Sequence, residues 1–291
     1  MPIAKVNNID IWYETFGNKE HDAVLLIMGG CCQGILWPTE FCEQLSNAGF
    51  FVIRYDHRDT GLSSYFDFEN NPYTMHDMMT DAISLLDYLA IQKFQLVGLS
   101  MGAPIAELIS VHYPERTKGQ MLIASSCDFR PMNLAYAGKP PEPNSLPRTK
   151  DIYLQWMNKF MSAPIKNEEE LIRFRVEGWN ILSGDKVPFE EKRYYELHKQ
   201  FIHRALHPES HLNHLHICRI SEDIVSRIPS EVTVPTVVIH GSEDPIVPPD
   251  HGKALAKAIK SSKYILVEGL GHVPNCHFYS LIIQQVQLMR A

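Results

Sequence analysis

Short apolar runs alternate with amphipathic segments along most of the chain. The apolar runs are rich in β-branched residues and predict buried strands at Ala23–Ile27, Phe51–Arg54, Phe94–Val97, Gln120–Ala124, Val234–His240 and Tyr264–Val267. Two more strands are predicted near the amino end, at Ile3–Val6 and Ile9–Phe16, with Asn7-Asn8 as a hairpin turn. Between these runs, apolar side chains recur at helical spacing, as in Pro38–Ala48 and Thr74–Leu89. The alternation predicts an α/β fold with a mostly parallel, eight-stranded sheet flanked by helices.

The pattern changes over residues 128–230. Five prolines in its first part, at positions 131, 140, 141, 143 and 147, predict an irregular linker. Four helical patterns follow, at Thr149–Met161, Asn167–Leu182, Phe189–Ala205 and Pro208–Arg219. A helical insertion between two halves of a sheet predicts a cap over one edge of that sheet. We therefore expect a core in two parts, residues 1–127 and 231–291, with a helical cap at 128–230.

One pentapeptide is typical of a catalytic serine turn. Gly98-Leu99-Ser100-Met101-Gly102 follows a predicted strand directly and precedes a helical pattern. A sharp strand-to-helix turn holds the residue at its tip in a left-handed backbone conformation, and small neighbours leave it room. The Ser100 hydroxyl would then project over the carboxyl edge of the sheet as a nucleophile. The Met101 N–H would point to the place where an oxyanion forms.

An acid and a base follow two later strands. Asp244 lies on the loop after one predicted strand, and His272 lies on the loop after the next. Because parallel strands end at the same edge of a sheet, both are expected beside Ser100. His272 would take the serine proton, and Asp244 would orient the imidazole. Asp128 is an alternative acid because it also follows a strand, and Glu243 is a lesser one.

The second oxyanion donor is expected on the loop Met28-Gly29-Gly30-Cys31-Cys32, which follows the strand Ala23–Ile27. Gly30 can present its backbone N–H beside that of Met101. A flexible glycine turn without a catalytic role is the alternative. Two fixed donors in a dry cleft would stabilise the developing negative charge by several kcal/mol, about 3–4 for a single donor.

Composition and charge limit the possible partners. Apolar residues make up 45% and charged residues 21% of the 291 residues, as in soluble globular proteins. The net charge of −7 and the scattered lysines and arginines argue against a nucleic-acid partner. No signal sequence and no long apolar stretch is visible, so no membrane span is expected. Six cysteines without a CxxC spacing favour reduced thiols and a cytoplasmic location. We expect a monomer or homodimer that acts on a small-molecule ester.

Two polar clusters are interpreted as structural. Six histidines lie between His198 and His216, but no Cys, Asp or Glu completes a tetrahedral set, so no metal site is expected. The cluster Asp56-His57-Arg58-Asp59 is interpreted as an anchor for the loop that follows its strand. No glycine-rich phosphate loop occurs, so we expect no cofactor.

The serine pentapeptide, the run Val237–Asp244 and the pair Gly271-His272 resemble the α/β-hydrolase fold superfamily. More narrowly, Val24–Trp37 and the run Arg54–Ser63 resemble the aclacinomycin methylesterase (RdmC-like) group. The resemblance implies a capped carboxylic-ester hydrolase with Ser100, Asp244 and His272 as its triad and Gly30 and Met101 as oxyanion donors. The chain departs from the group's pattern at Val273-Pro274-Asn275, which follows the histidine.

These features together predict a serine esterase that cleaves a small or medium carboxylic ester through an acyl-enzyme intermediate, without a cofactor. Several other reactions could use the same triad: lactone, thioester or carbon–carbon hydrolysis, acyl transfer and perhydrolysis. Dehalogenase and epoxide hydrolase chemistry is disfavoured because it needs an aspartate at position 100. A ligand-binding member of the fold without catalysis is the alternative from a different class.

Overall fold

The computed structural model describes residues 2–162 and 165–290, and its centre is a single sheet of eight strands. The strands are β1 (Ile3–Val6), β2 (Ile9–Phe16), β3 (Asp22–Ile27), β4 (Phe50–Tyr55), β5 (Phe94–Leu99), β6 (Thr117–Ile123), β7 (Thr236–Gly241) and β8 (Ser262–Val267). Their order across the sheet is β1-β2-β4-β3-β5-β6-β7-β8. The pairs β1–β2 and β2–β4 are antiparallel, and every later pair is parallel. The predicted α/β fold with a mostly parallel eight-stranded sheet is confirmed.

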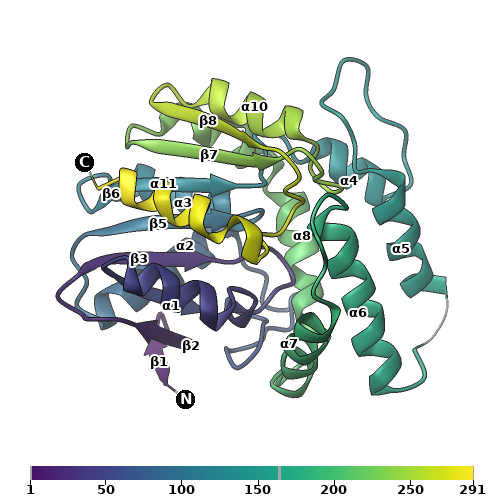
Figure 1. Ribbon diagram of the computed structural model, residues 1–291, viewed down its shortest axis with the longest axis horizontal. Coiled ribbons are helices and arrows are strands. Elements are labelled where there is room, and N and C mark those ends of the chain that lie inside the picture. Colours follow the sequence, from purple (N-terminus) through teal and green to yellow (C-terminus); the bar gives the residue numbers. More distant parts are fainter. Residues whose placement is uncertain (1, 163–164, 291) are drawn as a thin grey trace.

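Helices cover both faces of this sheet (Figure 1). The helices that pack on the sheet are α1 (Thr39–Asn47), α2 (Met75–Tyr88), α3 (Gly102–His112), α10 (Pro249–Ala258) and α11 (Tyr279–Leu288). Successive side chains of a strand point to opposite faces, so Leu25 packs in the core beneath α2, α3 and α10. Its neighbours Val24 and Leu26 pack in the second core, beneath α1 and α11. Both faces are dry, which explains why the strands appear in the sequence as continuous apolar runs.

A group of helices lies between β6 and β7 in the chain. These helices are α4 (Arg130–Tyr136), α5 (Asp151–Ser162), α6 (Glu168–Ser183), α7 (Glu191–His203), α8 (Asn213–Ile220) and α9 (Glu222–Arg227). Figure 1 shows α5, α6 and α7 beyond the ends of the strands and not over a face of the sheet. The expectation of an irregular linker is wrong at α4. Pro131 lies in the first turn of this helix, where its missing N–H costs no intrahelical hydrogen bond.

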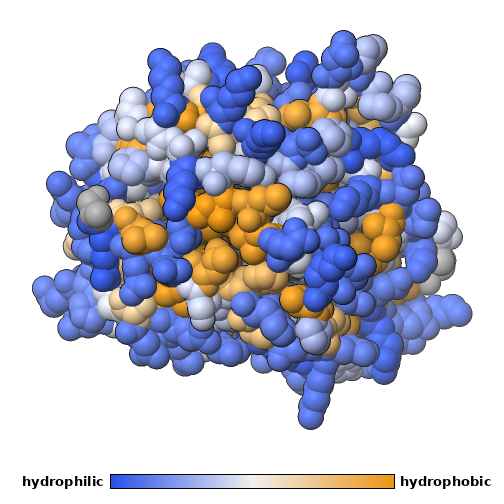
Figure 2. All heavy atoms as spheres, turned by 45° about the horizontal axis from the view of Figure 1, so that its top comes forward, coloured by the Kyte–Doolittle hydropathy of each residue, from blue (hydrophilic) through white to orange (hydrophobic). Residues whose placement is uncertain are grey.

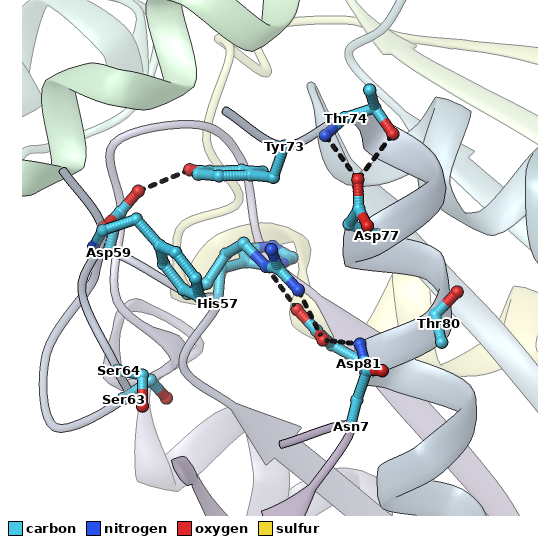
Figure 3. Close-up of polar contacts among 12 residues, drawn as sticks. Asn7, His57, Asp59, Ser63, Ser64, Tyr73, Thr74, Asp77, Thr80 and Asp81 are labelled. Atoms are coloured by element: carbon cyan, nitrogen blue, oxygen red, sulfur yellow. Dashed lines mark hydrogen bonds and ion pairs between the residues drawn. The ribbon is translucent and has the colours of Figure 1, made fainter. Parts of the chain in front are cut away.

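The loop after β4 is fixed by buried ionic and hydrogen bonds (Figure 3). Arg58 donates to both carboxylate oxygens of Asp81 on α2, at 2.6 and 2.8 Å. Asn7 donates to the same carboxylate at 2.8 Å, and the Tyr73 hydroxyl donates to Asp59 at 2.6 Å. The interpretation of this charged cluster as a loop anchor is confirmed for Arg58 and Asp59.

The surface is mostly polar. Hydrophilic side chains cover most of the face in Figure 2, and apolar side chains gather near its middle. Leu266 on the edge strand β8 is one large apolar residue that is exposed, at 50%. Within residues 2–162 and 165–290, the helices are all too short or too polar to span a bilayer.

Candidate active site

Ser100 lies at the tip of a sharp turn between β5 and α3. Its φ of 53° places it in the left-handed region, where a side chain other than glycine is strained by about 1–3 kcal/mol. A backbone hydrogen bond from Ser100 N–H to the Ile123 carbonyl, 2.8 Å long, ties the turn to β6. A Cβ atom at Gly98 would overlap the Gly102 carbonyl, and one at Gly102 would overlap the carbonyl of Ile27. The turn therefore requires both glycines, and the strain is held by the packing around it.

The sheet register brings three loops to one edge. Ile123 of β6 pairs with the last residue of β5, directly before Ser100, and also with Ile239 of β7. Gly241, at the end of β7, pairs with the last residue of β8. The loop with Asp244 and the loop with His272 therefore leave the sheet at the same edge as the serine turn.

A hydrogen bond joins the two predicted partners of the serine. His272 Nδ1 donates to Asp244 Oδ2 at 2.8 Å, so the imidazole Nε2 is the ring atom left free to act as a base. The other carboxylate oxygen of Asp244 accepts from the N–H groups of Ile246 and Val247, each at 2.9 Å. His272 is itself held by its backbone N–H, which donates to the Leu182 carbonyl at the end of α6 at 2.7 Å.

The environment keeps Asp244 ionised. Burial alone would raise the pKa of this fully buried carboxyl, but His272 and His240 and their hydrogen bonds hold its pKa below the ordinary value. His240 Nε2 lies 3.3 Å from Asp244 Oδ2. An anion in this position can stabilise an imidazolium at His272.

The other two acids are differently engaged. Asp128 pairs with Arg130 through two hydrogen bonds of 2.9 and 2.8 Å. Burial would raise the pKa of Asp128, but these bonds to Arg130 lower it. Glu243 accepts a 3.4 Å hydrogen bond from Ser242. In the described part of the chain, neither acid is bonded to His272, so the geometry favours Asp244.

The Ser100 hydroxyl makes no hydrogen bond to His272 among the described residues, and the serine is half-buried. Nucleophile and base are commonly apart in a free enzyme and come together when substrate binds. Gly29 packs directly against the serine, because a Cβ atom there would lie 3.3 Å from Ser100 Cβ.

The two expected oxyanion donors are neighbours. A Cβ atom on Gly30 would lie 3.6 Å from Met101 Cβ, so the loop after β3 and the start of α3 are in contact. Within the described residues, the backbone N–H groups of Gly30 and Met101 donate to no protein acceptor. Two free donors side by side next to Ser100 match the requirements of an oxyanion hole.

Two buried histidines position this loop, and the sequence did not single out their role. His57 Nε2 donates to the Met28 carbonyl at 2.9 Å. His214 Nδ1 accepts the Cys31 N–H at 3.0 Å, and its Nε2 donates to the Arg58 carbonyl at 2.9 Å. Burial lowers the pKa of His57 to about 4, and burial together with His57 lowers that of His214 to about 3. Both rings are therefore neutral at pH 7 and act as fixed hydrogen-bonding spacers.

Comparisons with known proteins place the chain among enzymes of this architecture. A family model described as serine aminopeptidase, S33, matches residues 19–175. The rhodomycin D methylesterase DauP of Streptomyces sp. (strain C5) is 35% identical, over 91% of this chain and 90% of its own. The rhodomycin D methylesterase DnrP of Streptomyces peucetius is also 35% identical, over 94% and 92% of the two chains.

Solved structures support the same fold. The esterase EaEST from Exiguobacterium antarcticum superposes with a TM-score of 0.73 at 18% identity, covering 99% of both chains. The resemblance to α/β hydrolases and to the methylesterase group is thereby confirmed. The chain belongs to the S33 serine aminopeptidase family of α/β hydrolases, together with the Streptomyces rhodomycin D methylesterases.

Proposed function

We propose that this protein is a serine esterase that cleaves a small or medium carboxylic ester through an acyl-enzyme intermediate. The observation that carries the proposal is the hydrogen bond from His272 to the buried Asp244, at the sheet edge where Ser100 occupies its strained turn. Membership of a hydrolase family and the 35% identity to two methylesterases support an ester as the substrate.

The proposed mechanism uses five groups. Ser100 Oγ attacks the ester carbonyl while His272 Nε2 takes its proton, and Asp244 stabilises the resulting imidazolium. The N–H groups of Gly30 and Met101 bind the oxyanion of the tetrahedral intermediate. His272 then protonates the leaving alcohol. Water, activated by the same imidazole, releases the acid from Ser100 and restores the enzyme.

The helices between β6 and β7 are proposed as a cap over this edge. We place the cap at residues 128–230, between core segments 1–127 and 231–291. The bond from His272 N–H to the end of α6 supports this division, since the helices reach the catalytic edge directly. A cytoplasmic monomer or homodimer is the assembly we propose, and six unpaired cysteines support a reducing location.

Ser100→Ala tests the proposal. Wild-type protein should release p-nitrophenol from its acetate or butyrate ester and react with a fluorophosphonate probe, and the variant should do neither. Its melting temperature should stay nearly unchanged, because alanine only removes an oxygen. Ser226→Ala, at an exposed serine of α9, is the matched control and should keep both signals. Wild-type protein that neither turns over esters nor is labelled would point to a binding protein without catalysis.

A further inference from the structure

Arg175 on α6 is a recessed guanidinium without a counter-ion. Its Nε donates to His198 Nδ1 at 3.4 Å, and its Cζ lies 3.7 Å from the centre of the Phe201 ring. The Phe201 side chain carries no charge. The His198 imidazole is neutral because burial holds its pKa well below the ordinary value. Among the described residues, no Asp or Glu forms an ion pair with Arg175. The positive charge is therefore not neutralised by the protein.

Other arginines that are buried or partly buried show that this is unusual among the described residues. Arg58 pairs with Asp81 at 2.6 Å, and Arg204 pairs with Asp56 at 2.9 Å. Desolvation of an unpaired charge is costly, and it lowers the pKa of the Arg175 guanidinium from its usual value. The fold neutralises Arg58 and Arg204 with aspartates but leaves the Arg175 guanidinium available to bind an anion.

Arg175 lies close to the proposed active site. It precedes Leu182 by seven residues, which is two helical turns or about 10 Å, and both side chains lie on the same face of α6. The Leu182 carbonyl accepts the His272 N–H. The backbone carbonyl of Phe201, whose ring contacts the guanidinium, accepts a 2.7 Å hydrogen bond from Gln33 Nε2. Gln33 continues the oxyanion loop. The guanidinium is thus linked to the His272 end of α6 through its own helix, and to the loop with Gly30 through Phe201 and Gln33.

The residues around Arg175 outline a recess. Cys32 and Tyr153 are near enough for the guanidinium to influence their titration, and both keep part of their surface accessible. Burial nonetheless raises the pKa of Cys32 to about 11, although Arg175 opposes the rise. Side chains that are desolvated yet still partly accessible are typical of the wall of a recess. Cys32 lies on the loop after β3 and Tyr153 on α5, so the surroundings of the guanidinium include both the oxyanion loop and the proposed cap.

We propose that Arg175 binds a carboxylate on the substrate, so that the preferred substrate is an ester with a second, ionised acid group. The inference rests on the proposed esterase function and names the substrate class. A guanidinium presents a planar pair of N–H donors that fits a carboxylate through two hydrogen bonds. In a recess shielded from water such a pair is strong, and hydrogen bonds to charged groups contribute about 1.5–3 kcal/mol. This corresponds to roughly ten- to hundredfold in kcat/KM.

The test compares esters that differ only in this charge. Monomethyl succinate, glutarate and adipate are the anionic probes. Their neutral counterparts are methyl 4-oxopentanoate, 5-oxohexanoate and 6-oxoheptanoate, in which a methyl ketone replaces the carboxylate. We expect wild-type protein to prefer the anionic ester by about tenfold or more in kcat/KM at the chain length that fits. Arg175→Met should bring this ratio close to one, and Arg175→Lys should retain part of it.

Arg173→Met is the matched control. Arg173 is an exposed arginine on the same helix, paired with Glu169 at 2.6 Å, and its loss should leave the ratio unchanged. Equal turnover of the two esters by wild-type protein at every length overturns the inference, and so does a preference that survives in Arg175→Met. Fluorophosphonate labelling of Ser100 separates this failure from failure of the esterase proposal. A labelled enzyme without charge preference refutes only the role of Arg175.

Discussion

At the scale of single residues, Asp244 is the acid that the fold pairs with His272 at the edge of the sheet. It is fully buried, yet its two oxygens accept hydrogen bonds from His272 and from two backbone N–H groups. These donors stabilise the charged form, which explains why its pKa is lowered although burial opposes ionisation. A neutral amide at this position would still fill the space but would no longer stabilise an imidazolium.

Asp244→Asn should therefore lower kcat by about 10⁴ with little change in structure, as expected for loss of a triad acid. Asp128→Asn is the companion variant, since Asp128 is engaged with Arg130, and it should keep most of the activity. Steady-state kinetics with p-nitrophenyl butyrate measure both. If instead Asp128→Asn abolishes activity and Asp244→Asn preserves it, the acid has been assigned to the wrong loop.

At the scale of elements, the loop after β3 depends on partners far away in the chain. Its carbonyl at Met28 accepts from His57 after β4, and its N–H at Cys31 donates to His214 on α8. Met28 and Cys32 pack on the apolar core, and between them Cys31 has a positive φ of 60°. The positions of α8 and of Gly30, the proposed oxyanion donor, are consequently linked.

His214→Phe should lower kcat about tenfold while KM changes less, because a misplaced donor weakens binding of the oxyanion more than binding of the ground state. His214→Asn should restore part of the rate, since its Oδ1 can accept the Cys31 N–H in place of Nδ1. His216→Phe is the control on the same helix, at an exposed histidine that already stacks on Phe68. Equal kcat values for the Phe and Asn variants at position 214 would argue against a positioning role.

The elements show which features a sequence can reveal. All eight strands were predicted within a few residues, the parallel ones because buried strands are continuous apolar runs between polar loops. Asn7 and Asn8 both have positive φ, as their hairpin turn requires. Helix α4 was missed because prolines were interpreted as breakers, although Pro131 suits a first helical turn.

The polar interior was harder to predict. His214 and Arg175 lie in segments that look like ordinary amphipathic helices, and their burial depends on packing between distant elements. His57 was grouped with an anchoring cluster, but its ring bonds the loop after β3. Local patterns determine which residues form an element. Which polar side chains it encloses depends on contacts that span most of the chain.

At the scale of the whole molecule, several histidines are buried in the neutral form. Burial lowers the pKa of His57 and His211 to about 4 and that of His214 to about 3, and it also lowers the pKa of His198 and His251. An unfolded chain takes up these protons near pH 6.5, whereas the folded chain does not. The contribution of these histidines to stability is therefore complete above pH 6.5 and falls as the pH drops toward their folded pKa values.

The free energy of unfolding should decrease from pH 7 to pH 5, by up to about 1.4 kcal/mol per pH unit for each such histidine below pH 6.5. Asp244 does not contribute in this range, because a lowered carboxyl pKa costs stability only as the pH falls below about 4. Urea unfolding at pH 7, 6 and 5 measures the slope. His251→Gln should reduce that slope, and an identical slope in the variant and in wild-type protein would contradict burial of a neutral ring at this position.

Two of the hydrogen bonds that join the helices to the loops proposed as catalytic, from His272 N–H to Leu182 and from Cys31 N–H to His214, constrain how such enzymes can diversify. A transplanted helical segment from a relative would bring a new pocket, but it would also have to supply a carbonyl and an imidazole at these two places. Chimeras that lack these two hydrogen-bond acceptors should still fold, but their kcat should be low. Natural variation in substrate preference is thus expected to proceed by side-chain replacement within the helices, with these two anchor points retained.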